Sequence, residues 1–216
     1  MIVVIASAID DEAASLVDRW RNDIAVLTPL DLSCPGWRIE TDQRESHFVA
    51  AGTQRCSSEV TGVLTRLPAV PATEMLVVAN SDREYAACEA TATLAWWLAT
   101  LRCPVVNDPT PASLIGPTRH PLHWRAVAAE LGIPTHPVLC DPLAEIESVS
   151  WCAVVDGQPL GHHDPEMGRR ATALAASTPS RLCAFGFAEP DLGLCAVSQL
   201  PPLTDALLGR LDEVFA

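Results

Sequence analysis

Histidine is the residue type whose spacing first points to chemistry here, because its imidazole binds metal ions and exchanges protons near neutral pH. His120 and His123 stand three residues apart, which places both on one face of a helix. His162 and His163 are adjacent and would point in different directions on a regular element. Neither an H-E-x-x-H motif nor a C-x-x-C pair accompanies them. We therefore expect no metal site and no cofactor, and keep a metal-dependent enzyme built on these four histidines as the alternative.

Two arginines and an Asn-Asp pair form the second set of candidates: Arg66, Asn107, Asp108 and Arg119. Asn107 and Asp108 directly follow a short apolar run that indicates a buried strand. Ligands often bind at the carboxyl ends of parallel strands, and the two arginines would supply positive charge there. We expect these four residues to contact a ligand in a crevice between two lobes. The alternative is that Asn107 and Asp108 only form a turn ahead of a proline.

No pattern of a catalytic nucleophile stands out, so the sequence leaves any catalytic residues unknown. The eight cysteines include no C-x-x-C pair, and we expect reduced thiols because no secretion signal precedes them. A G-x-S-x-G elbow, a Walker loop and a dinucleotide-binding G-x-G-x-x-G after the first strand are all absent. The sequence therefore favours a protein that binds its ligand over one that converts it.

The charge balance limits the partners. The formal net charge is −13, and all 14 basic residues are arginines. Nucleic-acid binding depends on neutralising phosphates, so this acidic balance disfavours it. The sequence has no apolar run of membrane-spanning length, and its first residues lack the basic start and cleavage site of a signal peptide. We expect a cytoplasmic protein without a nucleic-acid or membrane partner.

Apolar patterning predicts an α/β fold. The first half alternates apolar strands with helices, which indicates a parallel sheet, whereas two late strands joined by a short turn indicate an antiparallel pair. We expect an N-terminal parallel-sheet lobe, residues 1–117, packed on a smaller α+β lobe, residues 118–216. The expected strands are 2–6, 23–27, a hairpin of 37–40 with 47–51, 60–66, 105–107, 135–139, 149–155, 181–188 and 192–197. For 60–66 the alternative is a helix capped by residues 56–59. Helices are expected to start near Asp10, Ser81, Pro121, Asp164 and Thr204.

The longest predicted helix runs from Tyr85 to Cys103 and is apolar on most sides, which is typical of a helix inside a protein. Ser81 and Glu84 have the spacing of a capping box at its start. Adjacent Trp96 and Trp97 cannot share a helical face. We therefore expect one of them to face a partner.

Several short motifs, taken in order, resemble an ATP-grasp ligase of the RimK-like kind with its middle removed. They are the strand 60–66 ending in arginine, the helix ending in Trp-Leu at 97–98, the segments 105–109 and 114–117, the helix-turn 126–134 and the strand-turn 151–157. The resemblance implies a pre-ATP-grasp-like N-terminal lobe followed by a remnant of an ATP-grasp domain.

The departures from this family concern its nucleotide chemistry. The family holds nucleotide phosphates with lysines, but this sequence has no lysine, and Arg119-His120 stands where one is expected. The family's last strand usually carries a Glu and an Asn that hold Mg²⁺, where this chain has Ala196 to Gln199 without a carboxylate. The stretch between Pro137 and Glu147 is also too short for the domain that covers ATP.

The resemblance therefore implies a retained fold and a lost ligation. We expect a truncated, non-catalytic protein that binds a partner protein, a peptide or a small metabolite in a biosynthetic pathway. It would act beside a complete ligase or as a homodimer. A protein that still binds a nucleotide without turning it over is the remaining alternative.

Overall fold

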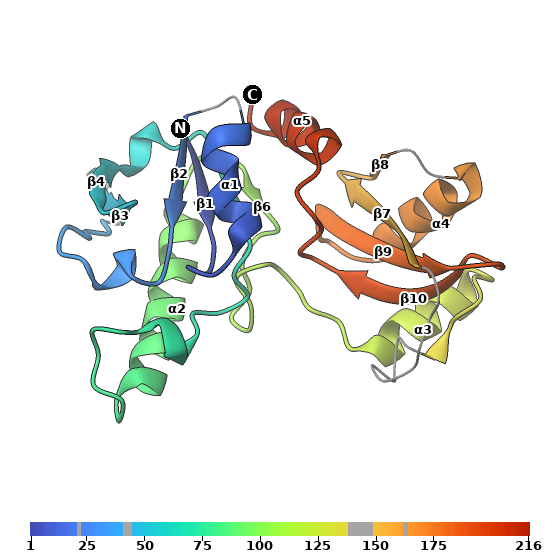
Figure 1. Ribbon diagram of the computed structural model, residues 1–216, viewed down its shortest axis with the longest axis horizontal. Helices are drawn as coiled ribbons and strands as arrows, with labels where there is room; N and C mark the ends of the chain where they lie inside the picture. The colour runs from blue at the N-terminus through green and yellow to red at the C-terminus, as the bar shows by residue number, and fades with distance from the viewer. Residues whose placement is uncertain (21–22, 41–44, 138–148, 162–163) are drawn as a thin grey trace. The chain divides into compact units, whose positions relative to one another are not determined.

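The computed structural model describes residues 1–20, 23–40, 45–137, 149–161 and 164–216. They form two compact units (Figure 1). Unit 1 contains residues 1–116 together with 212–216, and unit 2 contains residues 117–211. The predicted mixed α/β class is confirmed, with a parallel sheet in unit 1 and an antiparallel sheet in unit 2. No helix in the described ranges is long and apolar enough to cross a membrane.

Unit 1 is built on a four-stranded parallel sheet in the order β2-β1-β5-β6. The central strands β1 and β5 are buried along their whole length, so both faces of the sheet are covered, as is usual for parallel sheets. Ile2 pairs with Ile24 on one side and with Gly62 on the other. The strands are β1 Ile2–Ile5, β2 Ile24–Leu27, β5 Gly62–Thr65 and β6 Val105–Val106.

Helix α1, Asp11–Arg19, follows β1 and is capped by Asp10, whose carboxylate accepts a hydrogen bond from the Ala13 N–H. Its buried face carries Ala13 and Leu16, and Trp20 is buried just past its end. Val17, an apolar residue of the same helix, is 59% exposed. The reason is its position one residue beyond Leu16, which rotates it by about 100° toward solvent.

The predicted hairpin has the wrong partner strand for residues 47–51. The strand β3, His47–Ala50, pairs with β4, Thr53–Cys56, instead of with residues 37–40. Only Arg38 bridges to His47. Ala51 and Gly52 both have positive φ and form the tight turn of the observed hairpin. Three short 3₁₀ helices accompany these strands: η1 Asp31–Ser33, η2 Ser57–Glu59 and η3 Ala72–Glu74.

Helix α2, Arg83–Thr100, is the longest element of the described chain. The predicted capping box is wrong: Asp82 is the N-cap without a side-chain cap bond, and Ser81 hydrogen-bonds the Asp82 carboxylate. The predicted burial is correct for one side only. Ala87, Leu94, Trp97 and Leu98 are buried, whereas Tyr85 and Trp96 are 70% and 49% exposed.

The core of unit 1 centres on an aromatic cluster between α2 and β3. The ring centroid of Trp97 lies 4.8 Å from that of Phe48 and 5.7 Å from that of Trp37. The Trp97 indole N–H also donates to the Ser57 hydroxyl at 3.0 Å. Trp97 and Phe48 are both fully buried. These contacts join the long helix to the small hairpin beside the parallel sheet.

The last residues of the chain pack against Trp20 and the start of β5 in unit 1. Asp212 accepts a 2.6 Å hydrogen bond from the Trp20 indole, and the Phe215 ring lies 6.3 Å from the Trp20 ring. The Phe215 ring also covers Gly62 so closely that a Cβ atom there would lie 2.2 Å from a ring carbon. Glycine at the start of β5 is therefore required by this contact.

We expect Gly62→Ala to lower the free energy of unfolding by about 2 kcal/mol, because the new methyl group displaces the Phe215 ring. The matched control is Gly209→Ala in the interior of a helix, where a Cβ meets nothing within 4 Å. That control should stabilise by about 0.5–1 kcal/mol, since alanine favours helix. Urea unfolding followed by circular dichroism measures both, and equal effects of the two changes would refute the Phe215 contact.

Unit 2 contains an antiparallel sheet in the order β10-β9-β7-β8. The predicted pairing of two late strands is confirmed: β9, Leu182–Ala188, pairs with β10, Gly193–Ser198. The strand β7, Val149–Val155, turns at Asp156-Gly157 into β8, Gln158–Leu160, which the sequence pattern did not predict. Instead of the expected strand at 135–139, Thr135 makes one bridge to Leu194; residues 138 and 139 lie outside the described ranges.

Three helices complete the description, and each begins near the residue where the sequence predicts a helix start. Asp164 accepts from the Glu166 N–H at the start of α4, and Thr204 accepts from the Leu207 N–H at the start of α5. The Trp124 ring of α3 lies 5.6 Å from the Phe185 ring of β9, which anchors that helix to the sheet. The helices are α3 Pro121–Glu130, α4 Pro165–Ala175 and α5 Asp205–Val214.

Candidate functional site

The carboxyl edge of the unit 1 sheet is where its strand order reverses. The chain leaves β1 through α1 to reach β2 on one side, and β5 lies on the other side of β1. In open α/β sheets such a switch point is the usual place for a ligand. The turns at this edge follow β1, β5 and β6, and they carry the polar residues described next.

Arg66 directly follows β5 and is held by two carboxylates from the start of α1. Its Nε lies 2.8 Å from Oδ2 of Asp10, and its Nη2 lies 2.9 Å from Oε2 of Glu12. The Arg66 side chain is only 9% exposed, against 17% for Asp10 and 46% for Glu12. The backbone N–H of Arg66 also donates to the Ile5 carbonyl at 2.7 Å. The predicted ligand contact is thus a nearly buried cation paired within its own unit.

The Asp10 carboxyl has a pKa below its usual value although its surroundings push both ways. Burial alone would raise this pKa, but the Arg66 hydrogen bond, the Ala13 N–H bond and the Arg66 charge together outweigh it. Asp10 therefore has two tasks, since it caps α1 and neutralises Arg66. An ionised Asp10 at neutral pH follows from this geometry.

A second carboxylate holds the turn after β1. Glu74 accepts a 2.6 Å hydrogen bond from the Ser7 hydroxyl and a 2.8 Å bond from the Ala8 N–H. Ser7 Oγ in turn accepts from the Ile9 N–H at 3.2 Å. A backbone N–H at such a turn is a typical anion donor, and here a side chain of the same unit occupies it.

Asn107 and Asp108 follow β6 at the same edge of the sheet. Asn107 is 3% exposed and has a φ of 61°, the left-handed conformation that asparagine tolerates well. A Cβ at Gly116 would lie 3.0 Å from the Asn107 Cβ, so the returning chain packs closely on this turn. Asp108 is exposed. The structure thus gives Asn107 a turn-forming position and leaves the Asp108 carboxylate accessible.

Arg119 and the first histidine pair belong to unit 2, so the structure does not group them with the unit 1 residues. Arg119 is exposed just before α3. His120 is the N-cap of α3, and its Nδ1 accepts from the Leu122 N–H at 3.2 Å. The His123 ring is half-buried and lies 5.7 Å from the Trp124 ring. His162 and His163 lie outside the described residues.

His136 is a histidine whose contact the sequence did not predict. Its Nε2 lies 2.9 Å from Oδ1 of Asp191, in the turn between β9 and β10. The hydrogen bond from His136 is the main reason that the pKa of the Asp191 carboxyl lies below its usual value. Among the side chains that the structure describes, no three His, Cys, Asp or Glu lie close enough together to hold a metal ion.

The end of β10 is where the family resemblance placed magnesium ligands. The Ser198 hydroxyl accepts from the Leu200 N–H at 3.0 Å. The Gln199 amide donates to the Pro117 carbonyl at 3.1 Å and to the Ser180 hydroxyl at 3.0 Å. Magnesium requires hard oxygen ligands, usually carboxylates, but these two side chains are neutral and bonded to their own unit. The residues present here do not fit a Mg²⁺ site.

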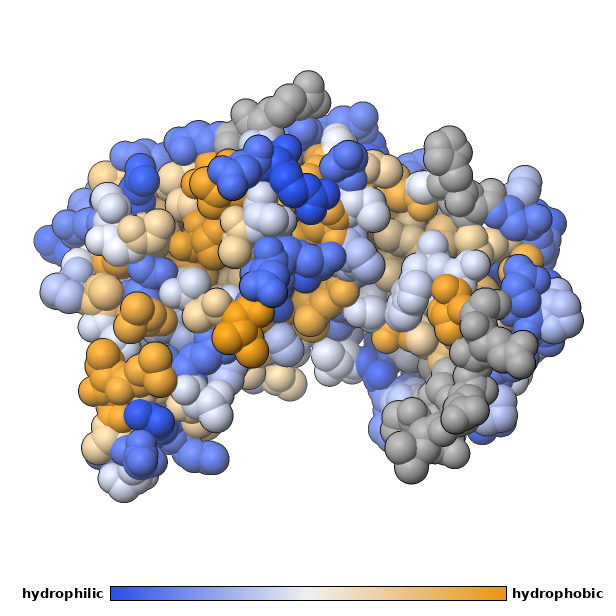
Figure 2. Space-filling model, viewed as in Figure 1, coloured by the Kyte–Doolittle hydropathy of each residue, from blue (hydrophilic) through white to orange (hydrophobic). Residues whose placement is uncertain are grey.

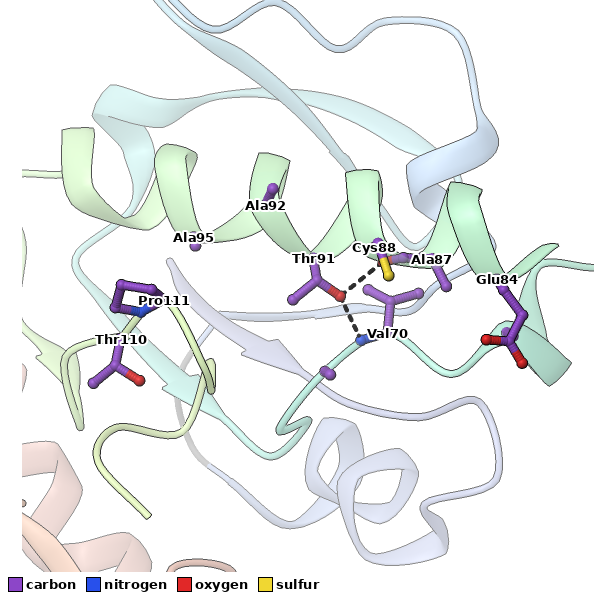
Figure 3. A pocket seen from close by; sticks show the side chains of 11 residues that line it. Val70, Glu84, Ala87, Cys88, Thr91, Ala92, Ala95, Thr110 and Pro111 are labelled. Atoms are coloured by element: carbon purple, nitrogen blue, oxygen red, sulfur yellow. Dashed lines mark hydrogen bonds between the residues drawn. The ribbon is translucent and has the colours of Figure 1, made fainter. Parts of the chain in front are cut away.

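A groove of about 660 Å³ runs along α2 in unit 1 (Figure 3). Thr91 joins the two sides of the groove, because its hydroxyl accepts from the Val70 N–H at 2.9 Å and donates to the Ala87 carbonyl. Glu84 lies at one end of the labelled helix face, and Pro111 lies toward the other end. The wall on the helix is made of small residues: Ala87, Cys88, Ala92 and Ala95. The groove can therefore accept a largely apolar chain segment.

Sequence reasoning found Arg66 but missed the residues that surround it. Asp10 and Glu12 were not among the predicted site residues. Their position after β1, one strand away from the arginine after β5, was the signal that links them. Glu74 had no comparable signal, since it follows a proline-rich loop without a regular period.

No protein-family model and no curated protein matches this sequence. Solved structures do match its fold. The macrocyclase MdnC from Microcystis aeruginosa MRC, bound with precursor peptide MdnA, aligns over 99% of this chain and 98% of its own, with a TM-score of 0.70 and 10% identity. This chain has an ATP-grasp-like fold.

Two further structures support the same fold. A RiPP-associated ATP-grasp ligase from Chryseobacterium gregarium, in complex with ADP and a leader and core peptide, has a TM-score of 0.64 at 9% identity, covering 98% of this chain and 96% of that one. The ATP-grasp ligase PsnB, complexed with minimal precursor, Mg and ADP, has a TM-score of 0.60 at 10% identity, covering 99% and 96%. The ATP-grasp-like fold that the sequence motifs predicted is thus confirmed, and the RimK-like subtype and the truncation stay predictions.

Proposed function

We propose that this chain is a non-catalytic, truncated protein of ATP-grasp-like fold that binds a peptide in a biosynthetic pathway. We further propose that it acts in the cytoplasm and as a homodimer. A peptide is preferred over a small metabolite because the structural neighbours named above are complexes with precursor, leader or core peptides. A shared fold supports a shared ligand only by analogy. The proposal of peptide binding therefore also needs support from the residues of this chain.

The proposal that the chain is non-catalytic rests on the residues at the end of β10. The resemblance assigns magnesium ligands to the position of Ser198 and Gln199. Both side chains are neutral and form hydrogen bonds within unit 2. The complete absence of lysine from the sequence agrees with this. Transfer of a phosphoryl group from ATP depends on metal ions and cations that neutralise the phosphates. A chain without these groups at the expected positions retains binding more readily than catalysis.

The peptide would be held at the carboxyl edge of the unit 1 sheet. Asp108 offers an exposed carboxylate beside the buried Asn107 turn, and Arg66, paired with Asp10 and Glu12, lies at the same edge. Arg119 of unit 2 remains part of the proposal as an exposed cation. A peptide with both backbone polar groups and charged side chains would find donors and acceptors among these residues.

The test uses synthetic peptides encoded beside the gene, labelled with fluorescein and followed by fluorescence anisotropy without ATP or Mg²⁺. We expect at least one peptide to bind with a dissociation constant of about 10 µM or below. Asp108→Asn and Arg119→Gln should each weaken it about tenfold. Asp18→Asn, an exposed carboxylate on α1, is the matched control and should change nothing.

Two results would contradict the proposal. One is that no encoded peptide binds; the other is binding that requires ATP and Mg²⁺. A thermal-shift series with ATP and Mg²⁺ addresses the nucleotide alternative, because a ligand that binds only the folded state raises the midpoint. Metal analysis of the purified protein addresses the histidine alternative. Stoichiometric zinc that is lost in His123→Ala would favour the metal-dependent enzyme.

A further inference from the structure

Helix α2 has a second apolar face that unit 1 does not cover. The face consists of residues three or four apart: Tyr85, Cys88, Ala92, Trp96 and Ala99. All five are exposed, and Trp96 and Tyr85 keep 49% and 70% of their surface accessible. A helix that is apolar on all sides is normally buried on all sides. In this chain the opposite face fills the core, so the exposed face requires another cover.

The groove of Figure 3 lies directly beside this face. Cys88 and Ala92 belong to both, so the exposed stripe and the groove form one continuous apolar surface. Figure 2 shows further apolar side chains gathered at the lower left, where the segment leading into α2 lies in Figure 1. Leu76 and Val77 in that segment are 65% and 67% exposed. Contiguous apolar surface of this kind marks an interaction site.

The two ends of α2 differ in charge. Asp82 and Glu84 stand at its start on either side of Arg83, whose guanidinium donates to the Val78 and Leu76 carbonyls, and Arg102 stands just past its end. Asp82, Glu84 and Arg102 are exposed. If α2 of a second copy packed parallel to this helix, the acidic residues at the two helix starts would lie next to each other. An antiparallel neighbour would bring Asp82 to Arg102, and it would also align the two helix dipoles favourably. The helix is thus complementary to a reversed copy of itself.

We propose that α2 packs antiparallel against α2 of a second copy of this chain, about a two-fold axis near Ala92. This arrangement pairs residues that are equally distant from Ala92, so Trp96 of each copy meets Cys88 of the other and Tyr85 meets Ala99. Each large side chain then faces a small one, which allows the helix axes to approach to about 8–10 Å. An isologous contact of this kind closes into a dimer and stops there.

The stripe can span the whole contact. Helix α2 has 18 residues, which corresponds to about 27 Å at 1.5 Å per residue. The aromatic residues lie near both ends of the stripe and the small residues lie at its middle. Burying Trp96 of each copy against Cys88 of the other would supply two aromatic anchors, one on each side of the axis. This inference names a surface for the proposed homodimer and does not depend on peptide binding.

The first test places a cysteine on the axis. In a Cys88→Ser background, Ala92→Cys should form an intermolecular disulfide under mild oxidation, because the two copies of residue 92 would face each other within disulfide reach. The control is Ala14→Cys in the same background, an exposed alanine on α1. We expect a crosslinked dimer on non-reducing gels for the first protein only. Equal crosslinking of the two proteins, or none in either, would overturn the proposal.

The second test compares two tryptophans of similar exposure. Sedimentation equilibrium of the full chain should give a dimer, and Trp96→Glu should raise its dissociation constant by at least about 100-fold, since the change occurs twice per dimer. Trp151→Glu on β7, where the tryptophan is 44% exposed, should change it less than threefold. Circular dichroism checks that both variants fold. A parent chain that is monomeric at 100 µM (an order of magnitude set by typical interface affinities), or a Trp96→Glu protein that dimerises normally, would refute the α2 surface.

Discussion

Trp97→Ala is expected to lower the free energy of unfolding by about 3–5 kcal/mol, enough to leave the protein largely unfolded near 37 °C. The indole is completely buried at the centre of the unit 1 core. Its removal separates α2 from Phe48 and Trp37, whose ring centroids lie 4.8 and 5.7 Å away. It also leaves the Ser57 hydroxyl without the indole N–H that donates to it at 3.0 Å. Chemical denaturation followed by tryptophan fluorescence and circular dichroism measures the loss.

The neighbouring residue gives the matched control. Trp96 is on the same helix and differs from Trp97 only in the direction in which its side chain points. It is 49% exposed, so Trp96→Ala should cost about 1 kcal/mol or less for the isolated chain. Similar losses in the two variants would mean that the helix is not oriented as described. The experiment is run at low protein concentration, since dimer dissociation would otherwise add to the effect of Trp96→Ala.

Arg66→Met is expected to lower the free energy of unfolding by about 3 kcal/mol at pH 7, because it removes one partner of a largely buried ion-pair network. Asp10 and Glu12 would then face each other's charge without the guanidinium that lies 2.8 and 2.9 Å away. The methionine keeps most of the length and volume of the arginine stem. The loss therefore reports the charge and the hydrogen bonds more than it reports packing.

The loss should depend on pH with a defined sign. The pKa of Asp10 is lower in the folded chain than in the unfolded chain, so its stabilising contribution is present above the unfolded value of about 3.9. That contribution disappears as the pH falls through the folded pKa. The difference between the parent and Arg66→Met should therefore be constant from about pH 5 to 8 and shrink below pH 4.

An exposed ion pair provides the control for Arg66. Arg38 pairs with Glu40, but the Arg38 side chain is 61% exposed. Arg38→Met should therefore change stability by about 0.5 kcal/mol or less. If Arg66→Met behaved in the same way, the network at the edge of the sheet would have no structural role. Arg66 would then act chiefly on a ligand.

The sequence predicted most elements because their signals are local. Ile2 to Ala6 is an unbroken apolar run, and the start of α4 combines a capping Asp164 with Pro165 at the first helical position. Each of these signals acts within a few residues, so no knowledge of distant contacts is needed. The order of these elements along the chain is what resembled an ATP-grasp ligase.

The predictions from sequence were wrong where contacts between distant residues determine the structure. The strand β3 pairs with β4 because Ala51 and Gly52 adopt positive φ, a conformation that an apolar pattern does not reveal. The exposed side of α2 could not be separated from its buried side, since both are apolar and only the position of Phe48 selects Trp97. The grouping of Arg66 with Asp10, Glu12 and Glu74 likewise depends on the order of strands in the sheet.

The positions of three candidate residues in the fold were predictable, whereas their contacts were not. Arg66, Asn107 and Asp108 do lie at the carboxyl edge of one parallel sheet, as their positions after strands indicated. Their partners did not follow from spacing, because hydrogen bonds such as those of Glu74 join segments 66 and 67 residues apart. The role of His120 as a cap required the backbone direction at Pro121.

The most direct test of the non-catalytic proposal is ATP consumption by the purified chain. The chain is incubated with ATP, Mg²⁺ and the encoded peptide that it binds. ADP is measured by chromatography, and the peptide mass is followed by mass spectrometry. We predict no ADP above the protein-free control and no loss of water from the peptide. ADP formation in step with the joining of a peptide carboxylate to an amine or a hydroxyl would contradict the account.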